Sequence, residues 1–265
     1  MSIHEFSQLS GVETSTLRYW DEIGIFSPAN RNPENNYRYY SPTQLLALNF
    51  VTTLSDLQFP LKVIAQLRKE RSPNQLLDLL EKQELAMDME MRDLQIRYSI
   101  IHARRKLISI GIIADENVIS IEHLDERTLS LWPRNEYMDD DTFINPFAKH
   151  VSKPHEHGIN LSFPKGSYYD SFSGFTTSTD KPDHFFTVDP VGAHYVNAGE
   201  YMVGYARGDY CDLGDLPERM SAYAEKNSIT TCGPVYIIHL HEEVCSDDPS
   251  RYLAQASVAT KTADK

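Results

Sequence analysis

The sequence is short of cysteine and contains no long apolar run. Its three cysteines, Cys211, Cys232 and Cys245, are odd in number and far apart in a chain of 265 residues. Neither a disulfide framework nor a Cys-x-x-Cys metal site is therefore indicated, and we expect free thiols. No stretch approaches the roughly 18 to 20 apolar residues of a membrane span, and the first residues lack the basic-then-apolar order of a signal peptide. We expect a cytoplasmic protein with no membrane partner.

Basic residues are fewer than acidic ones, and the whole excess of acidic residues lies in one part of the chain. The formal net charge is -13, which by itself argues against nucleic-acid binding. Residues 1–112 contain 13 Lys+Arg and 13 Asp+Glu, whereas residues 113–265 contain 12 and 25. The neutral first part can still present basic groups to phosphates, while the acidic second part is expected to repel DNA and to attract cations.

The beginning of the chain predicts two short helices joined by a tight turn. Apolar residues at a spacing of three predict a helix over residues 3–9 that ends at Gly11. We expect Thr14 or Ser15 to cap the next helix and Gly24 to close it. Leu17, Trp20 and Ile23 are expected to form its buried side.

A turn-rich segment and two more helices complete the expected first domain. Residues 27–40 are dense in Pro and Asn and predict a loop or a small hairpin. Ser41 is the expected N-cap of a third helix, with Pro42 in its first turn, and a fourth helix is expected to start at Pro60. The buried side of the third helix is predicted to comprise Leu45, Leu48, Val51, Thr52 and Leu54.

Residues 74–110 predict a helix on the order of 50 Å long, at about 1.5 Å per residue. Steps of three and four residues along it give an almost entirely apolar seam. A helix this long cannot bury such a seam against a small preceding domain, so a second copy of the chain is the simplest partner and a homodimer is expected. The seam comprises Leu77, Leu80, Glu84, Met87, Met91, Leu94, Tyr98, Ile101, Arg105, Ile108 and Ile112.

After Gly111 the pattern changes to short strand-like runs separated by Pro, Gly and Asp. A helix is predicted over residues 213–227 and another around 141–151. The expected class is an α+β domain. The strand-like runs are "NVISIEHL", "TLSLWP", "INLSFPKGSYYDSFSGF", "AHYVNAGEYMVGYARG", "PVYIIHLHEEV" and "YLAQASVAT".

The opening helix pair followed by a Tyr/Arg-bearing loop is the layout of a winged helix-turn-helix. In that design the second helix enters the major groove of DNA, while the loop and neighbouring helix ends contact phosphates. For an isolated helix, a solvated Arg18 and a half-buried Tyr19 would be the simpler interpretation. The candidate DNA-binding residues are Ser15, Thr16, Arg18 and Tyr19 on the helix, Tyr37, Arg38 and Tyr39 on the loop, and Lys62.

The order of these parts, with "STLRYW" and then "YRYY", resembles the N-terminal half of MerR-family transcription regulators over roughly residues 1–112. In that family "S-T-L-R-Y-Y" marks the recognition helix and "Y-R-x-Y" the wing; Trp20 replaces the usual second Tyr, which affects packing. The resemblance implies an antiparallel coiled-coil dimer on a palindrome within an overlong promoter spacer. When effector binds, such regulators bend and untwist the DNA so that RNA polymerase engages both promoter elements, an indirect partnership through DNA distortion.

The end of the chain, "GPVYIIHLHEEV" to "YLAQASVAT", resembles the GyrI-like effector-binding domain of multidrug-responsive regulators. The match is good over residues 185–260 and weaker over 120–184. The sequence departs from the family pattern at Ile237 and Gln255, where cation-sensing members have Glu. Three explanations remain open: other acids meet the ligand's charge, aromatic faces hold the ligand, or the ligand is not a cation. The candidate acids are Glu200, Glu242 and Glu243.

Aromatic residues are abundant in the second part, and aromatic faces recognise extended organic cations. Since Tyr is also favoured in strands, we expect only about a third of these aromatics to touch ligand, the rest being half-buried strand residues. The candidate ligand-binding residues are Trp132, Phe147, Tyr168, Tyr169, Tyr236, Ile237, His239, Tyr252 and Gln255.

Metal, cofactor and catalytic chemistry are not indicated. Residues 111–118 contain no Cys, which argues against the metal sensing of some MerR relatives. The pairs His155/His157 and His239/His241 have a spacing that could serve a metal, but such lone pairs are usually not ligands. No Ser/His/Asp or Cys/His set stands out. We expect no cofactor, no metal and no catalytic residue.

The leading hypothesis is a homodimeric regulator that binds promoter DNA and responds to a lipophilic effector, which we expect to be a cation. Its parts are a winged helix-turn-helix domain at 1–73, a dimerisation helix at 74–112 and a GyrI-like domain at 113–265. One alternative is an enzyme that hydrolyses a small reactive molecule in the GyrI-like domain, which the loss of Glu at Ile237 and Gln255 weakens. Another is an adaptor for a partner protein, which leaves the DNA-binding residues unexplained.

Overall fold

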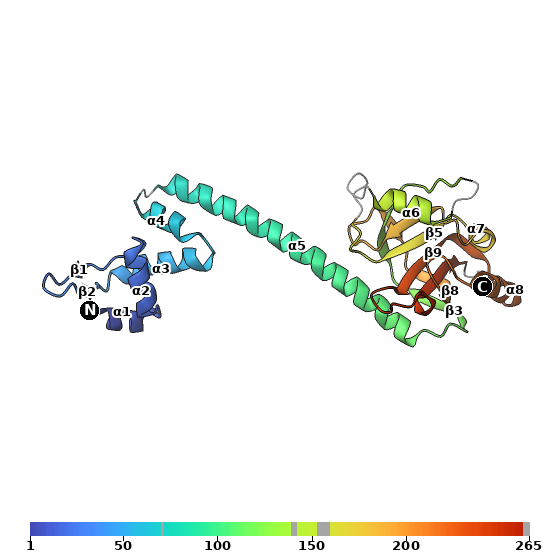
Figure 1. Ribbon diagram of the computed structural model, residues 1–265, viewed down its shortest axis with the longest axis horizontal. Coiled ribbons are helices and arrows are strands. Elements are labelled where there is room, and N and C mark those ends of the chain that lie inside the picture. The colour runs from blue at the N-terminus through green and yellow to red at the C-terminus, as the bar shows by residue number, and fades with distance from the viewer. Residues whose placement is uncertain (70–71, 139–141, 153–159, 262–265) are drawn as a thin grey trace. The chain divides into compact units, whose positions relative to one another are not determined.

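A computed structural model of the chain describes residues 1–69, 72–138, 142–152 and 160–261 (Figure 1). It divides into two compact units, Met1–Asp93 and Leu94–Lys265. The long helix α5, Pro73–Ile113, contributes to both. Within the described residues, no helix combines the length and the apolar character that crossing a membrane requires.

The first unit opens with helices α1 (Ile3–Ser10) and α2 (Thr14–Glu22). As predicted, Gly11 ends α1, with a φ of 74° that only glycine adopts easily. Gly24, with a φ of 77°, follows α2 as expected. The expected cap of α2 is wrong: the N-cap is Glu13, which has extended backbone angles and makes no side-chain cap bond. Thr14 and Ser15 are already inside the first turn.

The turn-rich segment forms a small hairpin, as predicted, with β1 (Asn30–Arg31) antiparallel to β2 (Arg38–Tyr39). Helices α3 (Gln44–Asp56) and α4 (Leu61–Lys69) follow. Ser41 is not the N-cap of α3, because the backbone N–H of Gln44 bonds to the Ser41 carbonyl in a tight turn that precedes the helix. The N-cap is Thr43.

The core of the first unit is aromatic. Phe6 of α1 stacks on Tyr40 with ring centroids 4.5 Å apart, and Phe26 lies 5.9 Å from each of them. Leu17 and Trp20 of α2 bury their side chains in the same cluster, as predicted. Burying one such side chain stabilises the fold by roughly 1.5–3 kcal/mol. Because these side chains are buried, the opposite side of α2 faces the solvent. The predicted burial is wrong for Ile23, which lies at the C-cap of α2 and is 39% exposed.

Helix α5 extends the predicted helix by three residues at its C-terminal end and is about 60 Å long. Most of its apolar seam is solvent-exposed in the single chain: Leu94 is 55% exposed, Tyr98 68% and Ile101 66%. Its first turns are fixed to the first unit, where the Gln83 side chain donates to the Leu57 carbonyl. Its last turns pack on the second unit through Leu107 and Ile110.

The second unit is built on an eight-stranded antiparallel sheet in the order β3-β8-β10-β9-β5-β6-β4-β7. Short runs rich in β-branched and aromatic residues form its strands, as the sequence predicts. Strand β6 and helix α7 (Phe172–Thr177) were not separately predicted; Ser171 caps α7 inside a run that was predicted as strand. The strands are β3 (Ile119–Leu124), β4 (Arg127–Leu131), β5 (Lys165–Tyr169), β6 (His184–Thr187), β7 (His194–Val196), β8 (Gly199–Arg207), β9 (Thr231–His241) and β10 (Leu253–Thr260).

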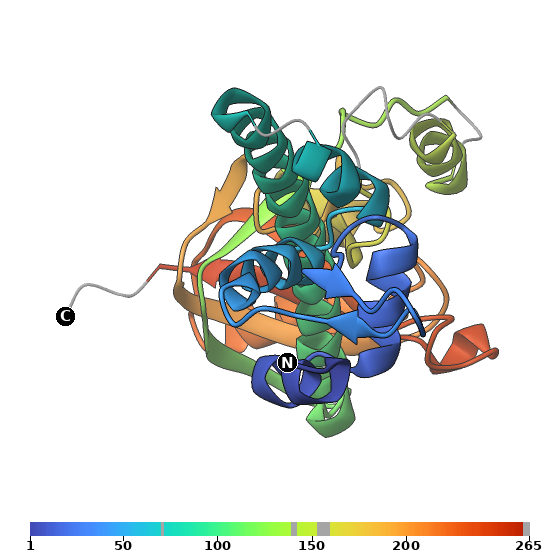
Figure 2. The ribbon, with the colours of Figure 1, turned by 90° about the vertical axis from the view of Figure 1, so that its left-hand side faces the viewer.

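Two apolar clusters cover the two faces of this sheet. Helices α7 (Phe172–Thr177) and α8 (Leu216–Lys226) pack on one face, in a cluster that includes Ile237. The C-terminal end of α5 packs on the other, in a cluster that includes Tyr236 and Ile238 (Figures 1 and 2). Helix α6 (Ile144–Val151) contributes to a smaller cluster around Trp132. Since successive strand residues face opposite sides, β9 supplies both faces.

Candidate functional site

Helix α2 divides its residues between the core and the solvent. Ser15 and Arg18 are exposed, Thr16 is half-buried, and Tyr19 is 50% exposed. This exposure favours an outward role for Tyr19 over the half-buried packing role. A guanidinium and two kinds of hydroxyl thus share the face of one short helix, where they can reach base edges and phosphates.

The hairpin that follows carries two exposed tyrosines and two arginines tied to α2. The rings of Tyr37 and Tyr39 meet edge to face, 5.6 Å apart, and each residue is about 40% exposed. Arg31 and Arg38 both donate to one oxygen of Asp21 at 2.5 Å. The carboxylate of Asp21 is buried, so Arg38 anchors the wing to α2 in addition to its expected role toward DNA.

Arg31 was not among the predicted residues, although its position on the opposite strand from Arg38 follows from the hairpin. Lys62, on α4, is exposed. Together with Arg18, these side chains give the first unit a local set of cations, although residues 1–93 contain 9 Lys+Arg and 13 Asp+Glu.

In the second unit, a cavity of about 270 Å³ lies against α6, β5 and β6. Phe143, Phe147, Phe185 and Tyr210 supply aromatic walls, and Glu243 and Lys165 supply charge. We call this the aromatic cavity. Its complete lining is Phe143, Ile144, Phe147, Lys165, Gly166, Ser167, Phe185, Tyr210, Cys211, His239 and Glu243.

The carboxylate of Glu243 accepts a hydrogen bond from the Tyr210 hydroxyl. Burial alone would raise the pKa of Glu243, but the Tyr210 hydrogen bond, a backbone hydrogen bond and the nearby cations of Lys165 and Arg104 outweigh it and leave the pKa lowered. Glu243 is therefore ionised at neutral pH. A carboxylate beside aromatic faces is a combination that suits an organic cation.

His239 lies at the base of the aromatic cavity and is 8% exposed. Burial lowers the pKa of its imidazole to about 4, so the ring is neutral at pH 7. Its ring centroid lies 4.7 Å from that of Tyr210. A neutral His239 therefore adds polarity to the cavity without adding a positive charge that would oppose a cation.

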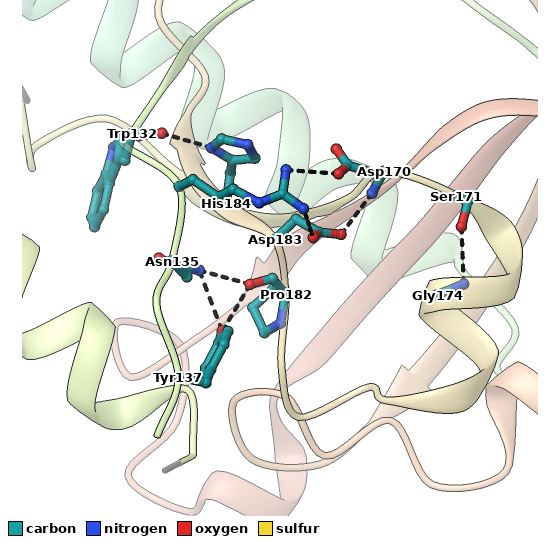
Figure 3. Close-up of polar contacts among 10 residues, drawn as sticks. Trp132, Asn135, Tyr137, Asp170, Ser171, Gly174, Pro182, Asp183 and His184 are labelled. Carbon is teal, nitrogen blue, oxygen red and sulfur yellow. Dashed lines mark hydrogen bonds and ion pairs between the residues drawn. The ribbon is translucent and has the colours of Figure 1, made fainter. Parts of the chain in front are cut away.

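Polar contacts fix the segment that carries Trp132, whose ring packs 5.7 Å from Phe147. The Trp132 carbonyl lies 2.9 Å from Nδ1 of His184, and Asn135 and Tyr137 both donate to the carbonyl of Pro182 (Figure 3). These bonds join the chain before α6 to the segment that leads into β6. They hold the aromatic wall of the cavity in place.

Of the nine predicted ligand-binding residues, two line this cavity and two more pack against residues that line it. Phe147 and His239 line it, Trp132 supports Phe147, and the Tyr252 ring lies 5.6 Å from that of Tyr210. Sequence reasoning did not single out Phe143, Phe185 or Tyr210. The aromatic content indicated such residues but could not choose among them.

The other five predicted residues lie elsewhere. Tyr169 and Ile237, 1% and 2% exposed, pack in the core under α7 and α8. Tyr168 and Tyr236 meet edge to face, 5.5 Å apart. Gln255 donates to the Tyr205 hydroxyl and lines a different cavity.

The three candidate acids have different environments. Glu200 is exposed and lies 3.1 Å from His123. Glu242 is buried and paired with Arg104 at 2.6 Å. Glu243 lines the aromatic cavity, so it is the one of the three that is placed to meet a ligand's charge there.

Of the two histidine pairs, only His239 and His241 lie in the described part of the chain, and their side chains have different surroundings. His155 and His157 lie outside the described residues. His239 lines the aromatic cavity, whereas Nε2 of His241 lies 3.3 Å from the Ile108 carbonyl. No group of three or more potential ligands converges in the described part of the chain.

Comparison with known proteins assigns a known domain to the beginning of the chain. The family model described as MerR HTH family regulatory protein matches residues 1–71. Over 248 residues the chain is 25% identical to the Multidrug-efflux transporter 2 regulator of Bacillus subtilis (strain 168), which covers 92% of this chain and 90% of that protein. It is 33% identical to the Multidrug-efflux transporter 1 regulator of the same organism over 98 residues, 37% of this chain and 28% of the relative.

Among solved structures, the one described as "Cryo-EM structure of EcmrR-DNA complex in EcmrR-RPo" aligns with 99% of this chain and 100% of its own chain, at 18% identity and a TM-score of 0.40. The family domain at residues 1–71 includes both α2 and the hairpin. It is followed by the long helix and by the antiparallel-sheet domain. Residues 1–71 are therefore a MerR-type helix-turn-helix domain, and over 92% of its length the chain is similar to a multidrug-efflux transporter regulator.

Proposed function

We propose that this protein is an effector-responsive activator, which binds palindromic promoter DNA as a homodimer and distorts the promoter spacer when a lipophilic aromatic cation binds its second unit. The observation that carries the proposal is the aromatic cavity, where the Glu243 carboxylate lies among aromatic faces, in a chain that begins with a MerR domain. Effector and DNA sites in one chain allow one to control the other.

The exposed side chains of α2 and the hairpin support the DNA-binding half. Ser15, Thr16, Arg18 and Tyr19 face solvent to the extent that base or phosphate contact requires. Tyr37, Arg38 and Tyr39 contact DNA from the wing, and Lys62 contacts a phosphate.

The exposed seam of α5 supports the homodimer. An apolar stripe on a helix about 60 Å long is unfavourable in water, and a second copy of the same seam covers it with matched spacing. A two-fold dimer in turn favours a palindromic operator, because each half-site meets an identical domain.

The aromatic walls and the ionised Glu243 support a cationic effector. A cation over an aromatic face gains about 0.5 to 2 kcal/mol per contact, and a carboxylate in the same cavity adds a charge interaction. The names of the two Bacillus regulators associate them with multidrug-efflux transporters, which fits an effector class defined by charge and lipophilicity.

One observation favours the alternative of hydrolysis in the same cavity. The Tyr210 hydroxyl and the Glu243 carboxylate are hydrogen-bonded and both line it. A base and a hydroxyl at this distance could activate water on a reactive ligand. Mass spectrometry of a bound compound over time separates the two functions, since a regulator returns its effector unchanged.

Calorimetry and footprinting together test the proposal. The full chain should bind tetraphenylphosphonium, and Glu243→Gln should weaken that binding by about tenfold or more. The matched control is Glu200→Gln, because Glu200 is exposed, lies 3.1 Å from His123 and does not line the aromatic cavity. The chain should also protect a palindromic site of promoter DNA. Unchanged binding by Glu243→Gln would contradict the cationic assignment, and the absence of a palindromic footprint would contradict the DNA assignment.

A further inference from the structure

A second cavity of the second unit contains an arginine that is not explained by the proposed function. Arg127 is the first residue of β4, and its side chain lies on the same face of the strand as the fully buried Leu129. Its Cζ is 5.4 Å from the centre of the Tyr236 ring. Its Nη2 donates to Oγ of Ser257 at 3.3 Å. The guanidinium thus reaches into the apolar cluster beneath α5.

No carboxylate pairs with this guanidinium among the residues that the structure describes. Its Nε is buried and has no hydrogen-bond acceptor. The groups that favour its charge are the hydroxyl-bearing rings of Tyr201 and Tyr236, and burial lowers the pKa of Arg127. A buried charge without a counter-charge is strongly unfavourable, and a bound anion is one partner that would offset this cost.

Arg127 borders a cavity of about 660 Å³ between the end of α5 and the sheet. Every lining residue belongs to the second unit. The walls are apolar, with Leu107 and Ile110 from α5 and Leu124, Val188 and Ile238 from the sheet side. A smaller cavity of about 390 Å³ shares Arg127 with it. The volume of the larger cavity, about 660 Å³, is within the range of small-molecule sites, which combine apolar walls with a few polar groups.

The acidic residues of this cavity are engaged with their own neighbours. Glu122 accepts from the Ser120 hydroxyl, and Glu126 accepts from the Tyr195 hydroxyl. Asp125 is exposed and pairs with Lys106 at 3.1 Å, and Asp115 accepts from the backbone N–H and the side-chain amide of Asn117. None forms an ion pair with Arg127, so the guanidinium retains its capacity for an anion.

We propose that this second cavity binds an amphipathic organic anion, a carboxylate or sulfonate on an apolar body, with Arg127 as the residue that receives the anionic group. The guanidinium can donate two parallel hydrogen bonds to the two oxygens of a carboxylate or to two of the three oxygens of a sulfonate, and the walls hold the apolar body. Neighbouring residues of β9 separate the two sites: Ile238 lines this cavity and His239 lines the aromatic cavity. The chain therefore carries two sites of opposite charge preference, and the second goes beyond the proposed cation response.

Fluorescence titration of the full chain tests the site with two probes of the same ring system. 1-Anilinonaphthalene-8-sulfonate carries the anion, and N-phenyl-1-naphthylamine lacks it. Arg127→Met should weaken binding of the sulfonate by about tenfold or more and leave the neutral probe within about twofold. Arg251→Met is the matched control, since Arg251 is exposed and its loss changes net charge equally. Equal binding of the sulfonate by Arg127→Met and the wild-type chain would overturn the proposal.

A competition with the unsubstituted chain does not depend on the folding of a variant. Naphthalene-1-sulfonate should displace the bound fluorescent sulfonate at a concentration at least about tenfold lower than 1-naphthylmethylammonium. Equal displacement by the two would overturn the proposal. Tetraphenylphosphonium binding, measured on the same proteins, should depend on Glu243 and not on Arg127, so failure of the anion site and failure of the cation response are separately visible.

Discussion

Arg104 of α5 donates to the buried carboxylate of Glu242 at 2.6 Å, and this pair connects the long helix to the aromatic cavity. Glu242 directly follows β9 and precedes Glu243. The Tyr210 hydroxyl lies between the two carboxylates, 3.4 Å from Glu242 and hydrogen-bonded to Glu243. A ligand whose charge attracts Glu243 therefore changes the position of the Tyr210 hydroxyl. This in turn changes the contacts of Glu242, the partner of Arg104.

This connection predicts that Glu242→Gln uncouples effector binding from DNA response. Glu242 does not line the aromatic cavity, so tetraphenylphosphonium should still bind within about threefold of the wild-type affinity. Effector-dependent activation in a purified transcription assay should fall, because a neutral amide holds Arg104 less strongly than a carboxylate does. Full activation by the variant would show that the response does not pass through this pair.

Loss of Asp21 should lower both the stability of the first unit and its affinity for DNA. Asp21→Ala removes the shared partner of Arg31 and Arg38, which are partly exposed, so we expect a loss of about 1–3 kcal/mol in the free energy of unfolding. Urea denaturation and a DNA mobility-shift titration measure the two effects. Glu22→Ala, at an exposed neighbour, is the control and should change neither.

Arg18→Ala should reduce DNA affinity and the dependence of that affinity on salt. If Arg18 contacts one phosphate, the slope of log affinity against log salt should fall by about 1, because one fewer counterion is released. Filter-binding titrations from low to moderate salt provide the slope. The control is Arg251→Ala, at an exposed position in the second unit, which should retain the wild-type slope.

The buried His239 predicts a stability change in acid. Its pKa is lowered to about 4 in the folded chain, below the ordinary value of 6.5, so the unfolded state binds more protons between these pH values. This contribution to stability is complete above about pH 6.5 and is lost as the pH falls toward 4, by up to about 3 kcal/mol. Urea unfolding at pH 7.5 and pH 5 should show a larger loss for the wild-type chain than for His239→Gln. An equal loss would contradict the buried neutral ring.

The first unit was largely predictable because its information is local. The spacing of Phe6, Leu17 and Trp20 specifies which helix faces are buried, and Gly11 and Gly24 end the two helices through their positive φ. The caps at Glu13 and Thr43 were missed, because a turn can satisfy the first N–H groups without a Ser or Thr cap.

The aromatic cavity was not predictable in the same way. Phe143, Phe185, Tyr210 and Glu243 come from four separate segments, and only the sheet order brings them together. Tyr236 and Ile237 are adjacent in sequence and were both expected to bind ligand. They face opposite sides of β9 and pack in different clusters. That Arg127 has no carboxylate partner among the described residues likewise depends on the packing of strands distant in sequence.

Energy transfer between fluorophores at the two ends of a promoter duplex measures the central claim most directly. With the full chain bound, adding tetraphenylphosphonium should raise energy transfer, because effector binding bends and untwists the spacer. The same addition to Glu243→Gln should leave the signal unchanged at concentrations that saturate the wild-type response. An unchanged signal with wild-type protein, under conditions where calorimetry shows the compound bound, would contradict the account.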